Sequence, residues 1–405
     1  MKNRNLNERI AKSWDLTTRP AIQAEEGDPD GRLPLPYPYT VPCADGMFQC
    51  LFYWDTYFAN LGLLRSGKIG QAENNLRNFI WLIRTYGYIP NGSLKRYLTR
   101  SQPPFFGMML RDIWEHTHNA ELLNEGLDAL KQELRFWNAR RLAPNGLNRY
   151  SCEGDRQFYL SSLEKYEKRT GIVRSGDREY LGLNAYAEAE SGWDFCGRFG
   201  GLCHEYNPVD LNSLLWFDER FLADHTEGDE RKRFGERAKI RKETMLRLMR
   251  GEDGVFRDYR YTTGETGRLL SCASFFPQFT GMVRDDRGMD DLLRALELPH
   301  GLQASGPTAA GTFQWGAGNG WPCLQYAAYV ALRNCGRKED AGRIAQKYVA
   351  LVERCEAGTG RLWEKYNVEN GTADAVAEYE TPEMYGWTAG VYQALLPVVN
   401  ETSHI

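Results

Sequence analysis

Two carboxylates in this sequence lie beside large aromatic residues, where a carboxyl group can do acid or base chemistry. Asp194 lies between Trp193 and Phe195 in the stretch EAESGWDFCGRFG. Packing among rings removes water from a carboxylate and raises its pKa, which lets it donate a proton near neutral pH. Asp194 is therefore a candidate general acid, although most acids beside an aromatic residue are solvated surface groups.

Glu364 is the second carboxylate of this kind. It follows Trp363 and precedes Lys365 and Tyr366 in the stretch RLWEKY. It is a candidate general base, the partner that a general acid needs for hydrolysis. With 54 Asp and Glu residues in the chain, a solvated surface position is the competing interpretation.

The helices that would position these carboxylates are of two alternating kinds. The first kind is apolar nearly all round and covers 52–64, 103–116, 208–223, 273–283, 321–332 and 385–398. The second kind is apolar on one side and covers 5–14, 68–86, 120–137, 229–249, 289–298 and 341–352. A wholly apolar helix is buried on all sides, whereas a one-sided helix is half exposed.

Hairpins that alternate these two kinds fit two concentric rings. We therefore predict an all-α fold, an (α/α)6 barrel with six inner and six outer helices, formed by residues 1–405 as a single domain. An α-solenoid is the alternative, but it would show a recurring motif of about 34 to 45 residues, and the sequence has none.

Two regions break the helical pattern, and both hold residues of chemical interest. Residues 140–206 contain Asp194, and residues 301–320 contain the Gly-rich GTFQWGAGNGW. Binding sites are usually built on loops that a rigid scaffold supports. We predict long active-site loops here, with 140–206 as a loop or lid insertion within the barrel.

Composition limits the partners. The chain has 50 basic and 54 acidic residues without a long run of either sign, so neither nucleic acid nor an anionic membrane is expected as a partner. The nine cysteines form no CxxC pair and the six histidines no HExxH, so neither a disulfide framework nor a zinc site is expected. The first residues, MKNRNLNERIAKSWD, lack an apolar core, and no apolar run reaches the about 18 residues that span a bilayer. We expect a cytoplasmic protein.

The acidic cluster DDRGMDD, residues 285–291, allows another function. Clustered aspartates bind Mg²⁺ and a diphosphate in terpene synthases, which are also helical. The spacing here is not DDxxD, and the cluster lies at the start of an outer helix, where acids favourably meet the helix dipole. We therefore favour a structural role.

Several motifs, in their order along the chain, resemble those of trehalases and related inverting α-glycosidases of glycoside hydrolase families 37 and 63. They are FYWDTYF (52–58), YGYIPNGSLKRYLTRSQPPFF (86–106), ESGWDF (190–195), NPVDLNSLL (207–215), FQWGAGNGW (313–321), EKYNV (364–368), EYE and GWTAGVY. They span nearly the whole core, which makes the resemblance specific.

The resemblance implies an (α/α)6 barrel in which Asp194 is the general acid and Glu364 the general base. It places these residues on the glucose side of the bond: Tyr53, Trp54, Asp55, Asn91, Arg100, Gln102, Gly192 and Trp315. Glu378 of EYE matches a further acid that contacts substrate. The family requires no metal or cofactor, and the implied function is inverting, exo-acting hydrolysis of an α-glucoside, either a disaccharide or a glucosyl conjugate.

The sequence departs from trehalases mainly on the leaving-group side. Met47 stands where trehalases carry an Arg, the RPE motif is missing, QWD becomes QWG at Gly316, and DAVA (374–377) replaces a Gly-rich lid. We therefore expect trehalose not to be the best substrate, unless Lys95, Arg96 or an arginine of 140–206 replaces the lost contacts.

Several alternatives stay open at this point. A true α,α-trehalase and a glucosylglycerate or mannosylglycerate hydrolase share the motifs, and the chain length is closer to the latter. A sugar-binding protein would keep the aromatic pocket without a use for two acids, and sugar epimerases depend on histidines that no motif here contains. The oligomeric state is not readable from the sequence.

Overall fold

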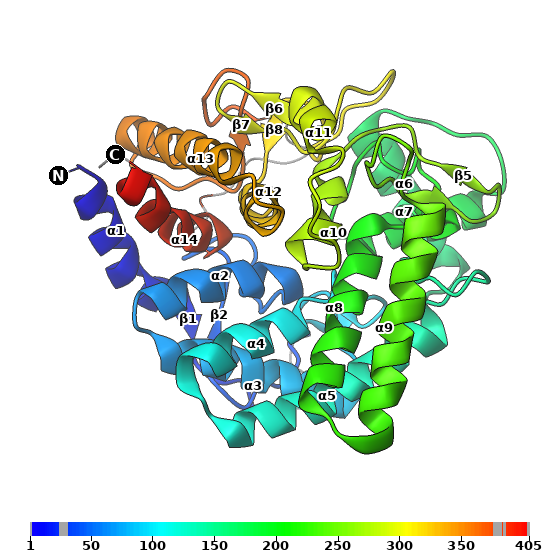
Figure 1. Cartoon of the computed structure of the whole chain (residues 1–405), viewed down its shortest axis with the longest axis horizontal. Coiled ribbons are helices and arrows are strands. Elements are labelled where there is room, and N and C mark those ends of the chain that lie inside the picture. Colours follow the sequence, from blue (N-terminus) through cyan, green and yellow to red (C-terminus); the bar gives the residue numbers. More distant parts are fainter. Residues whose placement is uncertain (1, 24–30, 376–382, 384–385, 403–405) are drawn as a thin grey trace.

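The inner ring of the barrel is closed in the computed structural model, which describes residues 2–23, 31–375, 383 and 386–402. Its described helices are α2 (Tyr53–Arg65), α4 (Phe106–Thr117), α8 (Val209–His225), α10 (Phe276–Phe279), α12 (Pro322–Asn334) and α14 (Gly386–Thr402). Each packs on the next in this order, and α14 returns to α2, which closes the ring (Figure 1).

The outer ring pairs with the inner one. Its described helices are α1 (Lys2–Ser13), α3 (Ile69–Tyr86), α5 (Ala120–Arg140), α9 (Gly228–Leu248), α11 (Met289–Leu296) and α13 (Lys338–Thr359). The alternation of the sequence explains the pairing, since α2 is buried along almost its whole length while α3 buries one side. The predicted all-α (α/α)6 barrel is confirmed.

Helix α1 is the outer partner of α14, as the sequence predicts. Leu6 and Ile10 of α1 are buried, and Gln393 of α14 donates through its amide to Asn7 Oδ1 at 3.0 Å. The two ends of the chain therefore lie on the same side of the barrel (Figure 1).

One inner helix is shorter than the sequence predicts. The apolar stretch 273–283 forms a 3₁₀ turn, η4 (Cys272–Phe275), followed by the single helical turn of α10. Gly281, which comes two residues after α10, has a φ of +77°, a left-handed conformation that does not continue a right-handed helix. The apolar pattern records burial here rather than helix length.

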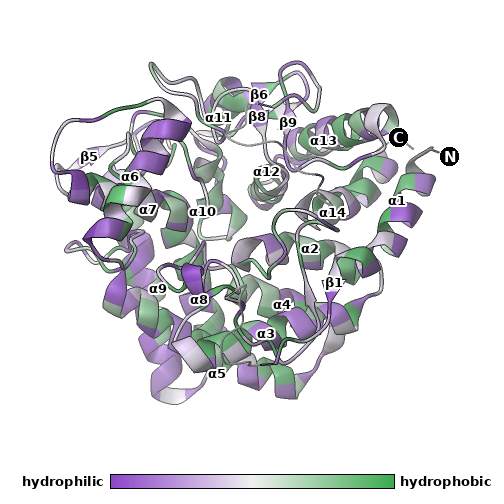
Figure 2. Ribbon diagram, turned by 180° about the vertical axis from the view of Figure 1, so that it is seen from behind, coloured by the Kyte–Doolittle hydropathy of each residue, from purple (hydrophilic) through white to green (hydrophobic). Residues whose placement is uncertain are grey.

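The segment 140–206 differs more from the prediction, because much of it is helical. It contains α6 (Arg156–Thr170) and α7 (Arg178–Glu190), which pack on each other. Asp155 caps α6 by accepting from Phe158 N at 2.8 Å, and Gly171 ends it with a φ of +72°. Much of α6 is hydrophilic and lies at the periphery of the molecule (Figure 2), so its hydrophobic periodicity is weak. Its two cap residues are therefore the main evidence for this helix in the sequence.

Short strands lie in the segments that connect the helices. The described pairs are β1 (Thr18–Arg19) with β2 (Tyr39–Thr40), β4 (Tyr259–Arg260) with β3 (Tyr206–Asn207) and β5 (Glu265–Thr266), β6 (Glu297–Leu298) with β7 (Gly301–Leu302), and β8 (Asn319–Gly320) with β9 (Tyr366–Asn367). All are antiparallel. The segment 301–320 has no helix, as predicted, and β8 brings its end to the residues that follow Glu364.

Candidate active site

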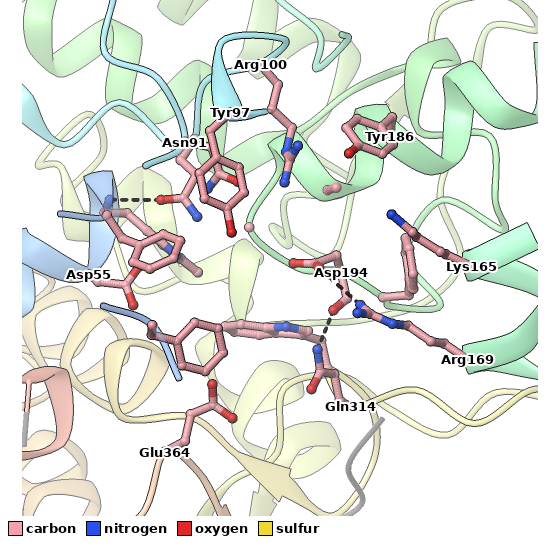
Figure 3. A pocket seen from close by; sticks show the side chains of 18 of the residues that line it. Asp55, Asn91, Tyr97, Arg100, Lys165, Arg169, Tyr186, Asp194, Gln314 and Glu364 are labelled. Carbon is pink, nitrogen blue, oxygen red and sulfur yellow. Dashed lines mark hydrogen bonds and ion pairs between the residues drawn. The ribbon is translucent and has the colours of Figure 1, made fainter. Parts of the chain in front are cut away.

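A cavity of about 310 Å³ brings most of the predicted site residues together (Figure 3). The predicted residues that line it are Trp54, Asp55, Asn91, Arg100, Gln102, Gly192, Asp194, Trp315 and Glu364. They come from segments up to 310 positions apart, since Trp54 lies in α2 and Glu364 just before β9. The barrel fold therefore brings residues from motifs far apart in the sequence into one cavity.

Two predicted site residues are not placed in this cavity. Tyr53 is completely buried and faces away from it, because neighbouring residues of a helix point about 100° apart. Its hydroxyl donates to Glu133 Oε1 at 2.7 Å and accepts from Phe106 N at 3.1 Å, so Tyr53 joins helices and does not line the site. Glu378 lies outside the described residues.

Tryptophan rings form the floor of the cavity. Trp315 stacks on Trp321 with ring centroids 3.7 Å apart, and it packs against Trp54 at 5.5 Å. Trp387, at the start of α14, meets Trp321 edge-on at 5.5 Å. Rings that support one another in this way hold their faces in fixed positions, and such faces suit the apolar face of a pyranose ring.

Glu364 is held on this floor by its backbone neighbours. The β8–β9 pair sets Gly320 opposite Tyr366, which brings Trp321 beside Glu364 and Lys365. Trp387 Nε1 donates to the Glu364 carbonyl at 3.0 Å. Lys365 Nζ, buried and 4.6 Å from the Trp321 ring centroid, donates to Glu364 Oε2 at 2.7 Å. This charge-assisted hydrogen bond holds the Glu364 carboxylate in one position.

Asp194 reaches the cavity through a tight turn after α7. Gly192 in that turn has a φ of +74°, and a Cβ there would lie 2.9 Å from two ring atoms of Trp54. Only glycine fits both the left-handed backbone and the close approach. The turn therefore brings Asp194 directly beside the floor.

The surroundings of Asp194 favour its protonated form. Its carboxyl is 37% exposed because it lines the cavity, with Arg169 Nη1 3.8 Å from Oδ2. Desolvation raises the pKa of Asp194 and outweighs the opposing charges of Arg169 and Arg100, while the charge of Glu364 adds to the rise. A carboxyl with a raised pKa can carry a proton at the pH where it must donate one.

Asp55 is a third carboxyl of the cavity. Desolvation, together with the charges of Glu364 and Asp194, raises the pKa of Asp55 to about 7. Figure 3 shows Asp55 and Glu364 on one side of the site and Asp194 on the other. Near neutral pH, Asp55 can therefore both donate and accept hydrogen bonds.

Arg100 lies between Tyr97 and Tyr186, with its guanidinium carbon 5.1 Å and 4.6 Å from the two ring centroids. It is 8% exposed, and its Nε and Nη1 have no hydrogen-bond acceptor among the described residues. Buried donors without an acceptor are costly. Oxygens of a ligand in the cavity would satisfy them.

A buried ion pair holds the loop that carries Arg100 and Gln102. Glu190, at the end of α7, accepts from Arg141 Nε at 2.8 Å and Nη2 at 2.9 Å, from Ser101 N at 2.8 Å and from Ser151 N at 2.7 Å. All four bonds are buried, so the carboxylate is fully compensated. One residue thereby fixes both the 99–103 loop and the turn that leads to Asp194.

The structure adds lining residues that the sequence did not single out. Lys165 and Arg169 come from α6 and Tyr186 from α7. Gln314 lies in the motif FQWGAGNGW and Trp387 in GWTAGVY. Of the groups expected to replace lost contacts, Arg96 and Arg169 line the cavity and Lys95 does not. Lys165 and Arg169 could have been predicted only by recognising α6, whose two ends Asp155 and Gly171 mark.

Met47 and Gly316, two positions that differ from the trehalase motifs, lie at or near the cavity. Met47 lines the cavity at 48% exposure. A Cβ at Gly316 would lie 2.9 Å from the Phe313 carbonyl oxygen, so this backbone does not accommodate the QWD aspartate without a shift.

No group of three or more potential metal ligands occurs among the described His, Cys, Asp and Glu residues. The acidic cluster 285–291 is engaged in ion pairs on the surface, for example Asp290 with Arg337 at 2.6 Å and Asp285 with Arg250. None of the described helices is both long and apolar enough to cross a bilayer.

The barrel and its cavity are those of an (α/α)6 glycoside hydrolase, and comparison with known proteins specifies the family. The family model described as Trehalase matches residues 2–400. This chain belongs to the trehalase family.

Relatives and solved structures agree with this assignment. The chain is 34% identical to a periplasmic trehalase of Pseudomonas aeruginosa, covering 97% of this chain and 76% of that protein. A periplasmic trehalase of Escherichia coli is 31% identical over 98% and 75% of the two chains. The neutral trehalase Nth1 of Saccharomyces cerevisiae superposes with a TM-score of 0.79 at 25% identity, over 98% of this chain and 80% of that one. A mannosylglycerate hydrolase of Thermus thermophilus shares the fold, with a TM-score of 0.62 at 15% identity over 96% and 100%.

The expectation of a cytoplasmic protein is wrong by these comparisons, because several relatives are named periplasmic trehalases. The expectation rested on the polar first residues and on the lack of an apolar run long enough to span a bilayer. These features bear on membrane insertion, and they do not distinguish one aqueous compartment from another.

Proposed function

We propose that the protein is an inverting, exo-acting α-glucosidase with Asp194 as general acid and Glu364 as general base. One observation carries the proposal: the two carboxyls enter one tryptophan-floored cavity from opposite sides (Figure 3), Asp194 with a raised pKa and Glu364 beside a buried Lys365. An inverting enzyme needs an acid on one face of the sugar and a base that activates water on the other. The trehalase family supplies the class, a glycoside hydrolase acting on a small α-glucoside.

In the proposed reaction, Asp194 gives its proton to the glycosidic oxygen as the C1–O bond breaks. Glu364 takes a proton from a water whose oxygen bonds to C1 on the opposite face of the sugar. The product is a β-anomer and a free alcohol. Lys365 positions the Glu364 carboxylate, and Arg169 lies beside Asp194.

The glucosyl unit is proposed to lie on Trp315 and Trp54, with its hydroxyls bound by polar groups above the floor. These are Asp55, Asn91, Arg100 and Gln102, with Gly192 allowing the close approach of the turn. Arg100 supports this assignment through its two donors without an acceptor among the described residues. Glu378 remains a predicted further contact.

We also propose residues 1–405 as one catalytic domain with 140–206 as an insertion. Support comes from α8, which packs directly on α4 and α5 even though α6 and α7 separate them in sequence. The insertion therefore adds a wall to the cavity and leaves the ring uninterrupted.

True trehalase activity is the second candidate, favoured by the names of the relatives at 31–34% identity. A screen of α-glucosides, including trehalose, and α-mannosides, with detection of the free sugar, tests both candidates. We expect glucose release from α-glucosides and little mannose release. Hydrolysis of α-mannosides alone would overturn the assignment of the glucosyl pocket, and no hydrolysis of any would overturn the proposed activity.

A further inference from the structure

We infer that the leaving-group side of the cavity binds an anion, so that the preferred substrates are α-glucosides whose leaving group carries a carboxylate or a phosphate. The inference rests on the proposed function, because it takes the roles of Asp194 and Glu364 as given. It assigns anion binding to the part of the cavity wall that α6 forms, and none of the family motifs covers this helix.

The position of the general acid defines the leaving-group side. Asp194 protonates the glycosidic oxygen, so the leaving group must lie next to its carboxyl. Figure 3 shows Lys165 and Arg169 on this side of the site, away from Asp55 and Glu364. A leaving group bound beside Asp194 therefore meets α6.

Helix α6 presents one polar face to the cavity. Ser162, Lys165 and Arg169 line it, and their spacing of three and four residues places them on one side of a helix. Lys165 and Arg169 are four residues apart, where like charges destabilise a helix. A bound anion between them would relieve this repulsion.

The charges favour an anion over a neutral sugar. Lys165 forms no hydrogen bond or ion pair with a described residue, and Arg169 lies 3.8 Å from Asp194. Asp194 loses its negative charge when it carries the proton for catalysis, which leaves this wall more positive. Lysine and arginine have no acceptor atoms, so these two side chains offer nothing to the hydroxyl protons of a neutral sugar, whereas a carboxylate or phosphate accepts from both cations.

The test compares substrates that differ only in charge. The first pair is α-glucosylglycerate with α-glucosylglycerol, and the second is trehalose 6-phosphate with trehalose. We expect kcat/KM to be roughly tenfold or more higher for the charged member of at least one pair, and the preference to shrink as salt is raised. The pair with the larger ratio identifies a carboxylate or a phosphate as the recognised anion.

Two variants of α6 test whether the preference for charged substrates depends on the side chains with which this helix lines the cavity. Lys165→Gln should lower the charged-to-neutral ratio about tenfold, whereas Lys168→Gln, an exposed position on α6 that does not line the cavity, should leave the ratio unchanged. Ratios near one in both pairs, or a ratio that Lys165→Gln does not move, would overturn the inference. Turnover of the neutral substrates in those cases would leave the proposed function intact, and absence of turnover for all four substrates would contradict the proposed function itself.

Discussion

The two sides of the cavity are built differently. The floor around Glu364 is aromatic and buried, with Glu364 4% exposed and tied to a buried lysine. The wall around Asp194 is more open, with Asp194 and Arg169 both 37% exposed. The floor belongs to the closed inner ring, to the loop that holds Trp315 and to β8–β9, whereas the wall belongs to the hairpin of α6 and α7 and to the turn that follows it. In the proposed mechanism the general base therefore depends on the barrel, whereas the general acid and the choice of leaving group depend on the 140–206 segment.

The largest expected effect is a loss of kcat when either carboxyl is replaced, and a substrate with a fluoride leaving group distinguishes the roles of the two. Asp194→Asn and Glu364→Gln should each lower kcat on an ordinary α-glucoside by about 10²- to 10⁴-fold without changing Tm much, because acid or base catalysis contributes that much. The two variants should differ on α-glucosyl fluoride, whose leaving group needs little protonation. Asp194→Asn should recover most of its loss there and Glu364→Gln should not.

Asp229→Asn is a suitable control for that experiment, since Asp229 is fully exposed at the start of α9. It should leave both activities unchanged. Equal losses on the fluoride for the two site variants would mean that Asp194 is not the acid, and the contrast between floor and wall would lose its chemical meaning.

An intermediate effect is expected where the two sides meet, at the contact of Gly192 with Trp54. Gly192→Ala must adopt a left-handed φ and push a Cβ into the Trp54 ring, so we expect a loss of about 1–3 kcal/mol in the free energy of unfolding. Displacement of Asp194 should lower kcat by about 10- to 100-fold. Urea unfolding and steady-state kinetics measure the two effects.

Gly87→Ala is the matched control. Gly87 also has a left-handed φ, +89°, but a Cβ there meets nothing within 4 Å. It should cost about 1 kcal/mol of stability and no activity. If both variants keep full activity, the Gly192 turn does not position Asp194.

The smallest effect concerns Asp55, on the Glu364 side of the cavity, and appears as a pH dependence of stability. The pKa of Asp55 is raised to about 7 in the folded protein, against about 3.8 unfolded. Between these values the folded protein binds the extra proton, so this group lowers stability as the pH rises from about 4 to 7. Asp55→Asn should remove this slope and raise Tm at pH 8 relative to the wild type by a few degrees, while activity falls. An unchanged difference in Tm between pH 5 and pH 8 would contradict the raised pKa.

Much of the floor was predictable from the sequence. The alternation of wholly apolar and one-sided stretches predicts the rings, because burial on all sides leaves no polar face. Asp194, Glu364 and the pocket residues follow from motifs that stay contiguous in the chain.

The wall was not predictable in the same way. Helix α6 buries few residues, so its periodicity is weak, and only Asp155 and Gly171 mark its ends. Tyr53 lies next to Trp54 in a motif, yet the helical turn sends the two side chains to different places. Adjacency in sequence does not give direction in space, and this limits what a motif assigns.

The stereochemistry of the first product tests the central claim most directly. Proton NMR during the first minutes of hydrolysis of an α-glucoside should show β-glucose before mutarotation, because water activated by Glu364 attacks the face opposite the leaving group that Asp194 protonates. An initial α-glucose signal would mean retention, which would require a carboxylate nucleophile and contradict the division of roles between floor and wall.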